Sequence, residues 1–238
     1  MKRLLRVVHA FFLILWLILS TVFFSLTIYL FRPFSMRLAH WSAQMWVAFL
    51  ILLSGVRITV TGKENLAPGR NYILMSNHLS AADIPLLYRA LPLPFVYLAK
   101  RELFLIPFFG WSMLFVGHIP INRKSPRSAK RSLDKAVRVL GKGKSSLVVF
   151  PEGTRSPTGE LGPFMLGVFS LAIAAQKETV PVAIQGSREI LPKGSYLVQP
   201  HPVSVRIGKP IPTTGYARES KKELANRVRE AMEELLRN

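Results

Sequence analysis

The sequence contains a histidine and an aspartate five residues apart, in the stretch SNHLSAADIP (residues 76–85). Residues with this spacing are about 500° apart around an ideal helix, so His78 and Asp83 meet only if His78 lies in a loop and Asp83 begins a helix. Ser80 and Asp83 are good capping residues and Pro85 is tolerated near a helix start, which favours that arrangement. The carboxylate would then fix the imidazole tautomer and leave the other nitrogen as a general base. A loop histidine followed by a capping aspartate would have the same composition.

A second polar segment, FPEGTRS (residues 150–156), follows a run of apolar residues. Gly153 allows a ligand to approach the backbone, and Arg155 can hold a phosphate through two hydrogen bonds. The alternative is a tight turn closed by a local ion pair between Glu152 and Arg155. The segment therefore predicts either an anion site or a simple turn.

Two further segments combine charge with apolar residues. In GHIPINR (residues 117–123), Arg123 can present its charge to an anionic head group or be an ordinary surface arginine. LAKRELFLIPFFGW (residues 98–111) places Lys100 before a strongly apolar run, which can line a tunnel for an alkyl chain or pack in the core.

These segments must be positioned by the strands before them. Residues 71–77 and 145–150 are continuous apolar runs, typical of strands that are buried on both faces. The other predicted elements alternate along the chain: strands at 56–62, 95–100, 179–184, 196–199 and 203–208, and helices at 84–91, 126–143, 165–176 and 219–238. This alternation predicts an α/β fold with a largely parallel central sheet flanked by helices. Loops at the carboxyl ends of such strands share one crevice, so the two polar segments are expected to form one site.

The first 55 residues have a different composition. Residues 10–31 carry no charge and would span about 33 Å as a helix, enough to cross a hydrocarbon core. No Ala-x-Ala-like cleavage site follows, so we expect a retained anchor. The apolar segment 38–55 can lie in the membrane interface, return as the second arm of a hairpin, or be a buried core helix. We therefore predict a membrane-associated region, 1–55, and an α/β domain, 56–238, that ends in an amphipathic helix.

The chain is strongly basic, with 32 Lys and Arg against 13 Asp and Glu and a net charge of +19. Such an excess is typical of proteins that bind nucleic acid, anionic membranes or anionic substrates. Without zinc-finger spacing or an aromatic RNA-binding motif, and beside a membrane anchor, lipid phosphates are the expected partner and nucleic acid is not. The absence of cysteine excludes disulfides, thiolate metal sites and an acyl-cysteine intermediate.

Four segments resemble, in order, the characteristic blocks of the glycerolipid acyltransferases. They are NHLSAAD, GHIPINR, FPEGTRS and VPVAI, and AKRELF and PFFGW are similar to the family's intervening segment. The chain departs from the family in the second block, where Pro120 and Asn122 replace a usual Phe and Asp, and after the third block, where Met165 and Leu166 replace a Phe-Lys pair.

The resemblance implies direct acyl transfer from acyl-CoA or an acyl carrier protein to the sn-2 hydroxyl of 1-acyl-sn-glycerol 3-phosphate, giving phosphatidate. It implies no metal and no bound cofactor. His78 would remove the hydroxyl proton, and Asp83 would orient His78. The acceptor's phosphate and glycerol would be held by Arg123, Glu152, Gly153, Thr154 and Arg155, with Asn77, Lys100, Ser156 and Pro181 as supporting residues.

The same resemblance implies a membrane phospholipid surface as partner. It places the protein at a bacterial inner membrane with the catalytic domain on the cytoplasmic face, where acyl donors are found. Three other functions stay open: acylation of another lysophospholipid or a lyso-ornithine lipid, hydrolysis of a membrane phosphate ester, and lipid binding without catalysis. The sequence carries no signal for the oligomeric state.

Overall fold

The computed structural model describes residues 2–192 and 198–237. Its strands are β1 (Ile58–Thr61), β2 (Ile73–Ser76), β3 (Phe95–Lys100), β4 (Ile119–Ile121), β5 (Ser146–Val149), β6 (Thr179–Gln185) and β7 (Val203–Ile207). Its α-helices are α1 (Lys2–Phe31), α2 (Met36–Ser54), α3 (Asp83–Ala90), α4 (Phe109–Phe115), α5 (Pro126–Gly141), α6 (Gly167–Ala175), α7 (Ser187–Ile190) and α8 (Lys221–Arg237). Short 3₁₀ turns are η1 (Lys63–Asn65), η2 (Arg101–Leu105) and η3 (Arg218–Ser220).

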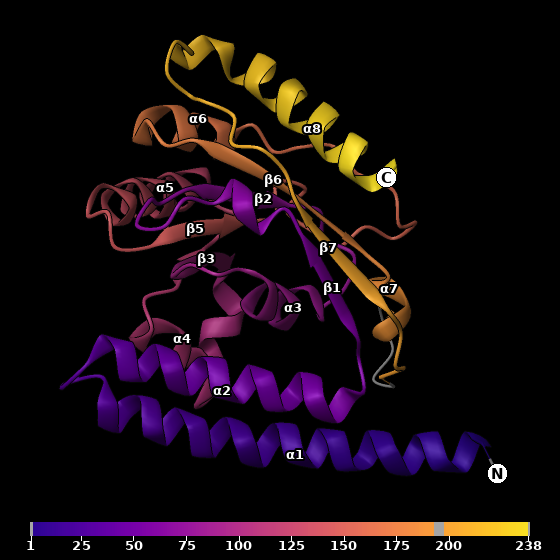
Figure 1. Cartoon of the computed structure of the whole chain (residues 1–238). Coiled ribbons are helices and arrows are strands. Elements are labelled where there is room, and N and C mark those ends of the chain that lie inside the picture. The colour runs from indigo at the N-terminus through magenta and orange to yellow at the C-terminus, as the bar shows by residue number, and fades with distance from the viewer. Residues whose placement is uncertain (1, 193–197, 238) are drawn as a thin grey trace.

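The strands form one sheet in the order β1-β7-β6-β2-β5-β3-β4 (Figure 1). Every neighbouring pair is parallel except β6 and β7, which run antiparallel. The predicted α/β fold with a largely parallel sheet is therefore confirmed. The central pair, β2 and β5, is in register with Leu74 opposite Val148, so both strands end at the same edge of the sheet.

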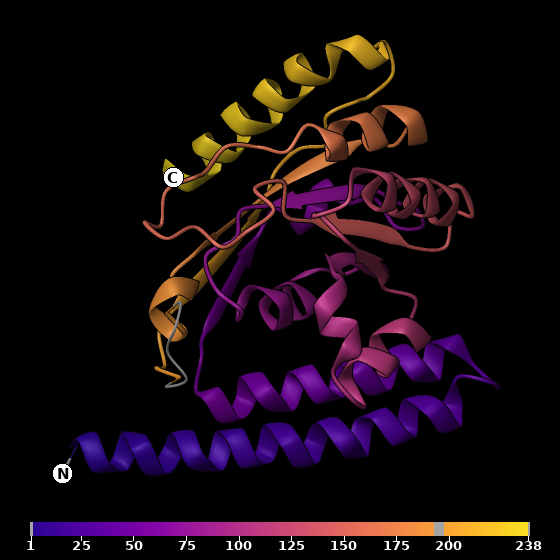
Figure 2. The same ribbon diagram turned by 180° about the vertical axis from the view of Figure 1, so that it is seen from behind.

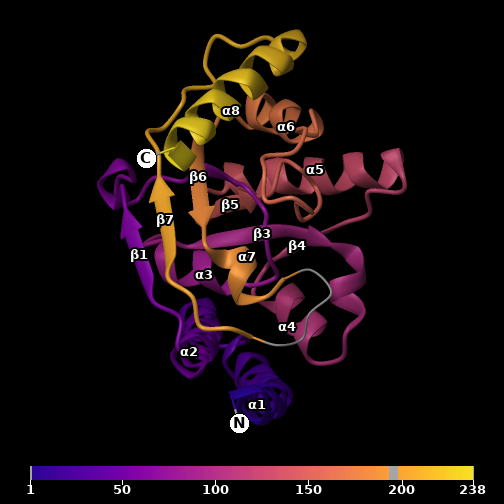
Figure 3. The same ribbon diagram turned by 90° about the vertical axis from the view of Figure 1, so that its right-hand side faces the viewer.

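Helices cover both faces of the sheet, because successive side chains of the buried strands point to opposite faces. Ile73 and Met75 of β2 pack against α5, α6 and α8, whereas Leu74 packs against α3 on the other face. Figure 2 shows α3 and α4 between the sheet and the two N-terminal helices, and Figure 3 shows α5, α6 and α8 on the opposite face. The sheet is therefore buried between two layers, as its continuous apolar strands require.

The N-terminal helices α1 and α2 form a hairpin that lies beneath α3 and α4 (Figures 1 and 2). Ser35 in the turn caps α2 by accepting a hydrogen bond from the Leu38 N–H. Polar side chains of the hairpin bond to backbone carbonyls around α4: Tyr29 to Phe108, Arg32 to Phe115 and His40 to Val116. These bonds fix the hairpin to the α/β part of the chain.

One described helix is long and apolar enough to cross a membrane, judged by length and composition: the Ile14–Phe31 part of α1. Only 17% of that segment is buried. The second apolar segment, 38–55, falls within α2, which runs back along α1. The two helices therefore form a hairpin, and how they sit in a bilayer stays a prediction.

Some elements differ from the sequence prediction. The short elements α4, β4 and α7 were not predicted, because three to seven residues are too few for a periodic pattern. The predicted strand 196–199 is wrong in its described part, because Val198 and Gln199 are not in a strand, and residues 196–197 lie outside the described residues.

Candidate active site

The two polar segments singled out in the sequence lie side by side at the edge of the sheet. One follows β2 and the other follows β5, and these strands are direct neighbours. A backbone hydrogen bond of 2.8 Å from the Ser156 N–H to the His78 carbonyl joins the two loops. The expectation that both segments share one crevice therefore holds for their position.

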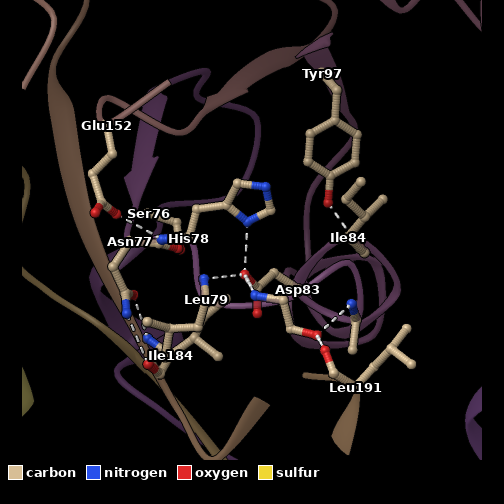
Figure 4. Close-up of polar contacts among 12 residues, drawn as sticks. Ser76, Asn77, His78, Leu79, Asp83, Ile84, Tyr97, Glu152, Ile184 and Leu191 are labelled. Atoms are coloured by element: carbon tan, nitrogen blue, oxygen red, sulfur yellow. Dashed lines mark hydrogen bonds and ion pairs between the residues drawn. The ribbon is translucent and has the colours of Figure 1, made fainter. Parts of the chain in front are cut away.

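His78 and Asp83 are in direct contact (Figure 4). His78 Nδ1 lies 2.8 Å from Asp83 Oδ2, and the same oxygen accepts hydrogen bonds from the backbone N–H groups of Leu79 (2.7 Å) and Ser80 (2.9 Å). Asp83 is the first residue of α3 and is fully buried, whereas the His78 side chain is 16% exposed. The carboxylate oxygen can only accept, so Nδ1 carries the proton and Nε2 is available as a base.

Aromatic rings fix the plane of the imidazole. The His78 ring stacks on Phe150 with a centroid separation of 4.0 Å and an interplanar angle of 17°. Phe150 in turn lies parallel to Tyr97, 6.4 Å away, and the Tyr97 hydroxyl donates to the Ile84 carbonyl in α3. Sequence reasoning missed Phe150 and Tyr97 as site residues; the available signal was an aromatic residue at the start of the FPEGTRS segment.

Glu152 bonds to the protein backbone. Its Oε1 accepts from the His78 N–H at 2.8 Å (Figure 4), and its Oε2 accepts from the Gly162 N–H at 2.8 Å. Burial raises the pKa of Glu152, and the two backbone hydrogen bonds partly oppose that effect. Both carboxylate oxygens therefore bond to the backbone of the two loops, and the contact of Glu152 with an acceptor stays a prediction.

Arg123 and Gly153 come together although they are distant in the sequence. Gly153 has a φ of +72°, and a Cβ at this position would collide with Met165 Sδ and lie 3.7 Å from Arg123 Nη1. Partial desolvation lowers the pKa of the Arg123 guanidinium, while the charge of Glu102 opposes that effect. The left-handed turn at Gly153 therefore exposes backbone next to a cation, an arrangement suited to an anionic group.

The next predicted site residues, Thr154, Arg155 and Ser156, differ in burial and in hydrogen bonding. Arg155 is half-buried and Thr154 is exposed, and the ion pair considered between Glu152 and Arg155 does not form among the described residues. The Ser156 hydroxyl closes its own turn by bonding to the Glu160 carbonyl at 2.7 Å. Arg155 therefore forms no ion pair among the described residues.

The remaining predicted supporting residues are Asn77, Pro181 and Lys100. The Asn77 side chain donates to the Ile184 carbonyl (2.9 Å) and accepts from the Ile184 N–H (2.8 Å), which ties the end of β2 to β6 (Figure 4). Pro181 is buried within β6. Lys100 is exposed and its Nζ lies 3.7 Å from Glu102 Oε1. Among the described residues, none of these three forms a hydrogen bond with the His78 imidazole.

Within residues 2–192 and 198–237, no three His, Cys, Asp or Glu side chains gather in a way that could hold a metal ion.

The chain is similar to known acyltransferases. A sequence profile described as "Acyltransferase" matches residues 57–185, more than half of the chain. A chloroplastic 1-acyl-sn-glycerol-3-phosphate acyltransferase of Arabidopsis thaliana is 35% identical over 86% of this chain and 56% of the relative. The 1-acyl-sn-glycerol-3-phosphate acyltransferase of Saccharomyces cerevisiae is 35% identical over 84% of this chain and 67% of the relative. The chain thus spans between about half and two thirds of the length of these relatives.

The fold is also that of a solved acyltransferase. The crystal structure of the 1-acyl-sn-glycerophosphate acyltransferase PlsC from Thermotoga maritima superposes with a TM-score of 0.85 at 25% identity, over 100% of this chain and 99% of the other. The matched profile includes both polar loops and the strands that carry them. The profile match, the identity to the curated relatives and the shared fold together show that this chain belongs to the acyltransferase family.

Proposed function

We propose that the chain transfers a fatty acyl group from an acyl thioester to the sn-2 hydroxyl of 1-acyl-sn-glycerol 3-phosphate, giving phosphatidate. The observation that carries the proposal is the contact of His78 with buried Asp83, which leaves Nε2 as the available base. The relatives in Arabidopsis, yeast and Thermotoga are named for acylation of this acceptor, which supports the same substrate here.

In the proposed reaction, His78 Nε2 takes the proton of the acceptor hydroxyl as its oxygen attacks the thioester carbonyl carbon. Asp83 stabilises the imidazolium ion that forms. The tetrahedral intermediate then expels the thiolate, which takes the proton from His78. Every proton and bond is thereby accounted for without an enzyme-bound acyl group, consistent with a chain that has no cysteine.

The acceptor's phosphate is proposed to bind between Arg123 and Arg155, against the backbone at Gly153 and Thr154. Arg123 Nη1 lies close to Gly153, and Arg155 has no ion-pair partner among the described residues. Two guanidinium groups can each bond two phosphate oxygens, which suits a phosphate monoester. Acyl-CoA or an acyl carrier protein is the proposed donor, and no resident cofactor is proposed.

The protein is also proposed to act at a membrane surface. Exposed apolar side chains gather on α1, α2 and α4, which adjoin one another: Phe11, Phe12, Ile18, Phe23, Leu26, Leu30, Trp41, Leu52, Trp111, Leu114 and Phe115. So many exposed apolar side chains on adjoining helices would be costly in water and are suited to lipid. We propose residues 1–55 as the membrane-binding part and 56–238 as the catalytic domain, on the cytoplasmic side of a bacterial inner membrane.

A second acceptor is favoured by one observation. Met165 and Leu166 stand where the family often has a Phe-Lys pair; Met165 lies against Gly153 and near Arg123, and neither residue brings a charge to the phosphate side of the site. A lysolipid with a different head group, such as another lysophospholipid or a lyso-ornithine lipid, is therefore the alternative acceptor. Met165→Lys is expected to increase the preference for lysophosphatidate over such lipids.

The test is thiol release from a long-chain acyl-CoA, or from an acyl carrier protein, by detergent-purified protein with a panel of lysolipids. We expect release that depends on lysophosphatidate, forms phosphatidate, and is lost in a folded His78→Ala variant. Turnover at the wild-type rate in that variant would contradict the mechanism. Release of inorganic phosphate without loss of thioester would instead identify a phosphate-ester hydrolase.

A further inference from the structure

Arg229, in the middle of α8, holds a loop segment on the opposite side of the chain from the membrane hairpin. Its Nη1 donates to the Gly162 carbonyl at 2.8 Å and its Nη2 donates to the Leu161 carbonyl at 2.9 Å. Its Nε pairs with Glu233 at 2.8 Å, and its guanidinium lies 5.5 Å from the centre of the Phe164 ring. All three nitrogens are thus engaged.

The segment held by Arg229 is connected through hydrogen bonds of Glu152 to the loop that carries His78. The Gly162 N–H donates to Glu152 Oε2, and Glu152 Oε1 accepts the N–H of His78, each at 2.8 Å. Three successive hydrogen bonds therefore connect the guanidinium of Arg229 to the backbone of His78. The C-terminal helix touches neither His78 nor Asp83 in this connection; it acts through Gly162 and Glu152.

We propose that Arg229 is a positioning residue for the acyl-transfer reaction, which fixes Gly162 so that Glu152 holds the backbone of His78 in place. This inference rests on the proposed function for its effect on rate, although the bond series itself is a property of the fold.

Besides Arg229, the 161–162 segment is held by the packing of Leu161 against the core and by the bond from Gly162 to Glu152. Arg188 of α7 holds the preceding residues by donating to the Pro157 and Thr158 carbonyls, and a hollow of about 710 Å³ lies beside residues 158–161, lined also by Leu79 and by Arg229 itself. Packing on that side is therefore incomplete, and the two bonds from Arg229 are direct constraints on the segment. Gly162 also lies close to Glu152, since a Cβ at Gly162 would be 3.0 Å from Oε2.

Loss of Arg229 should displace the backbone of His78, because Gly162 and Glu152 would no longer be fixed. A buried carboxylate that loses one of two hydrogen bonds must rotate, take up a proton or admit water, and each change alters its bond to the His78 N–H. A small displacement of the reacting base lowers the rate steeply, because transfer depends on near-attack geometry. Substrate binding at Arg123 and Gly153 involves other atoms and should change little.

The test compares Arg229→Met and Arg229→Lys with a matched control, Arg206→Met. Arg206 also anchors α8, through a 3.1 Å bond from Nη1 to the Leu235 carbonyl, but it has no link to Glu152. We expect Arg229→Met to lower kcat by about 10- to 100-fold with the KM of both substrates nearly unchanged. Arg229→Lys should recover part of the rate, and Arg206→Met should lower thermal stability while leaving kcat within about twofold at temperatures where it is folded.

Hydrogen–deuterium exchange provides a readout that does not need turnover. Peptides covering residues 77–84 and 158–165 should exchange faster in Arg229→Met and not in Arg206→Met. Unchanged kcat and exchange in Arg229→Met, or equal losses in both variants, would overturn the inference and leave Arg229 as a simple anchor of α8. If the wild-type protein transfers no acyl group to any acceptor, the proposed function fails, and the exchange comparison still decides whether Arg229 positions the His78 loop.

Discussion

The imidazole of His78 lies flat against the phenyl ring of Phe150, with ring centroids 4.0 Å apart and ring planes inclined by 17°. His78 lies in the loop after β2 and Phe150 directly follows β5, so the stack depends on the pairing of these strands in their observed register. The Phe150 face limits rotation of the imidazole and provides an electron-rich surface for the imidazolium ion of the proposed proton transfer.

Phe150→Leu should therefore lower kcat by about 2- to 10-fold, in line with the free energy of an aromatic pair. Phe150→Tyr is the matched control, because it keeps the stacked ring and should retain most of the activity. Steady-state kinetics at saturating donor and acceptor measure the effect. Full activity in a folded Phe150→Leu variant would show that the stack is dispensable.

Asp83→Asn should reduce kcat by about 100- to 10,000-fold while the protein stays folded. The amide is isosteric, but it can present a donor to His78 Nδ1 and so favour the tautomer that blocks Nε2 as a base. Asp134→Asn, at an exposed position on α5, is the control. A fall in Asp83→Asn that is matched by loss of helical circular dichroism would point to misfolding instead of the proposed orienting role.

Arg123→Ala should raise the KM for lysophosphatidate by about tenfold, because a charge-assisted phosphate contact is lost. The KM for the acyl donor should stay near its wild-type value. Arg127→Ala, an exposed arginine at the start of α5, should change neither constant. A variant in which only the donor KM rises would move Arg123 to the donor side of the site.

His118 gives a pH dependence with a definite sign. It is buried between the Tyr88 hydroxyl (2.7 Å from Nε2) and the Tyr97 N–H (3.1 Å from Nδ1), and burial lowers its pKa to about 3. The folded protein keeps His118 neutral, whereas the unfolded chain takes up a proton below the ordinary value of 6.5. The stability contributed by His118 is therefore present above pH 6.5 and lost as the pH falls, by about 1.4 kcal/mol per pH unit.

Denaturant unfolding in detergent between pH 6.5 and 4 measures this contribution. His118→Gln keeps polar partners for both tyrosines but cannot titrate, so its stability should fall less steeply with acid than that of the wild type. The exposed His201 supplies the control, and His201→Gln should reproduce the wild-type slope. Identical slopes for His118→Gln and the wild type would mean that His118 is not held neutral.

The parts of the fold and site that were predictable are those with local causes. The apolar runs of β2 and β5, and the spacing of His78, Asp83 and Pro85, fix a strand, a loop and a helix start within a few residues. The three residues of β4 have no such signal, since strand pairing with Leu98 to Lys100 of β3 is what orders them. The resemblance to the acyltransferase blocks also suggested Glu152 as a ligand contact.

The orientation of Glu152 depends on contacts that no local pattern contains. Its two partners, His78 and Gly162, lie on different loops, and Gly162 is in turn held by a helix at the far end of the chain. The Phe150 stack has the same origin. Such features follow from tertiary packing, which only the assembled sheet defines.

The bond between the His78 N–H and Glu152 closes a loop of 74 residues. Contacts across such separations form after local ones, because the entropy of closing the loop must be overcome first. The apolar hairpin, in contrast, is built from neighbouring residues at the beginning of the chain and is complete once α2 has emerged from the ribosome. If the proposed membrane role holds, a chain under synthesis can therefore meet the bilayer long before β5 pairs with β2, and it binds lipid before His78 reaches its final position.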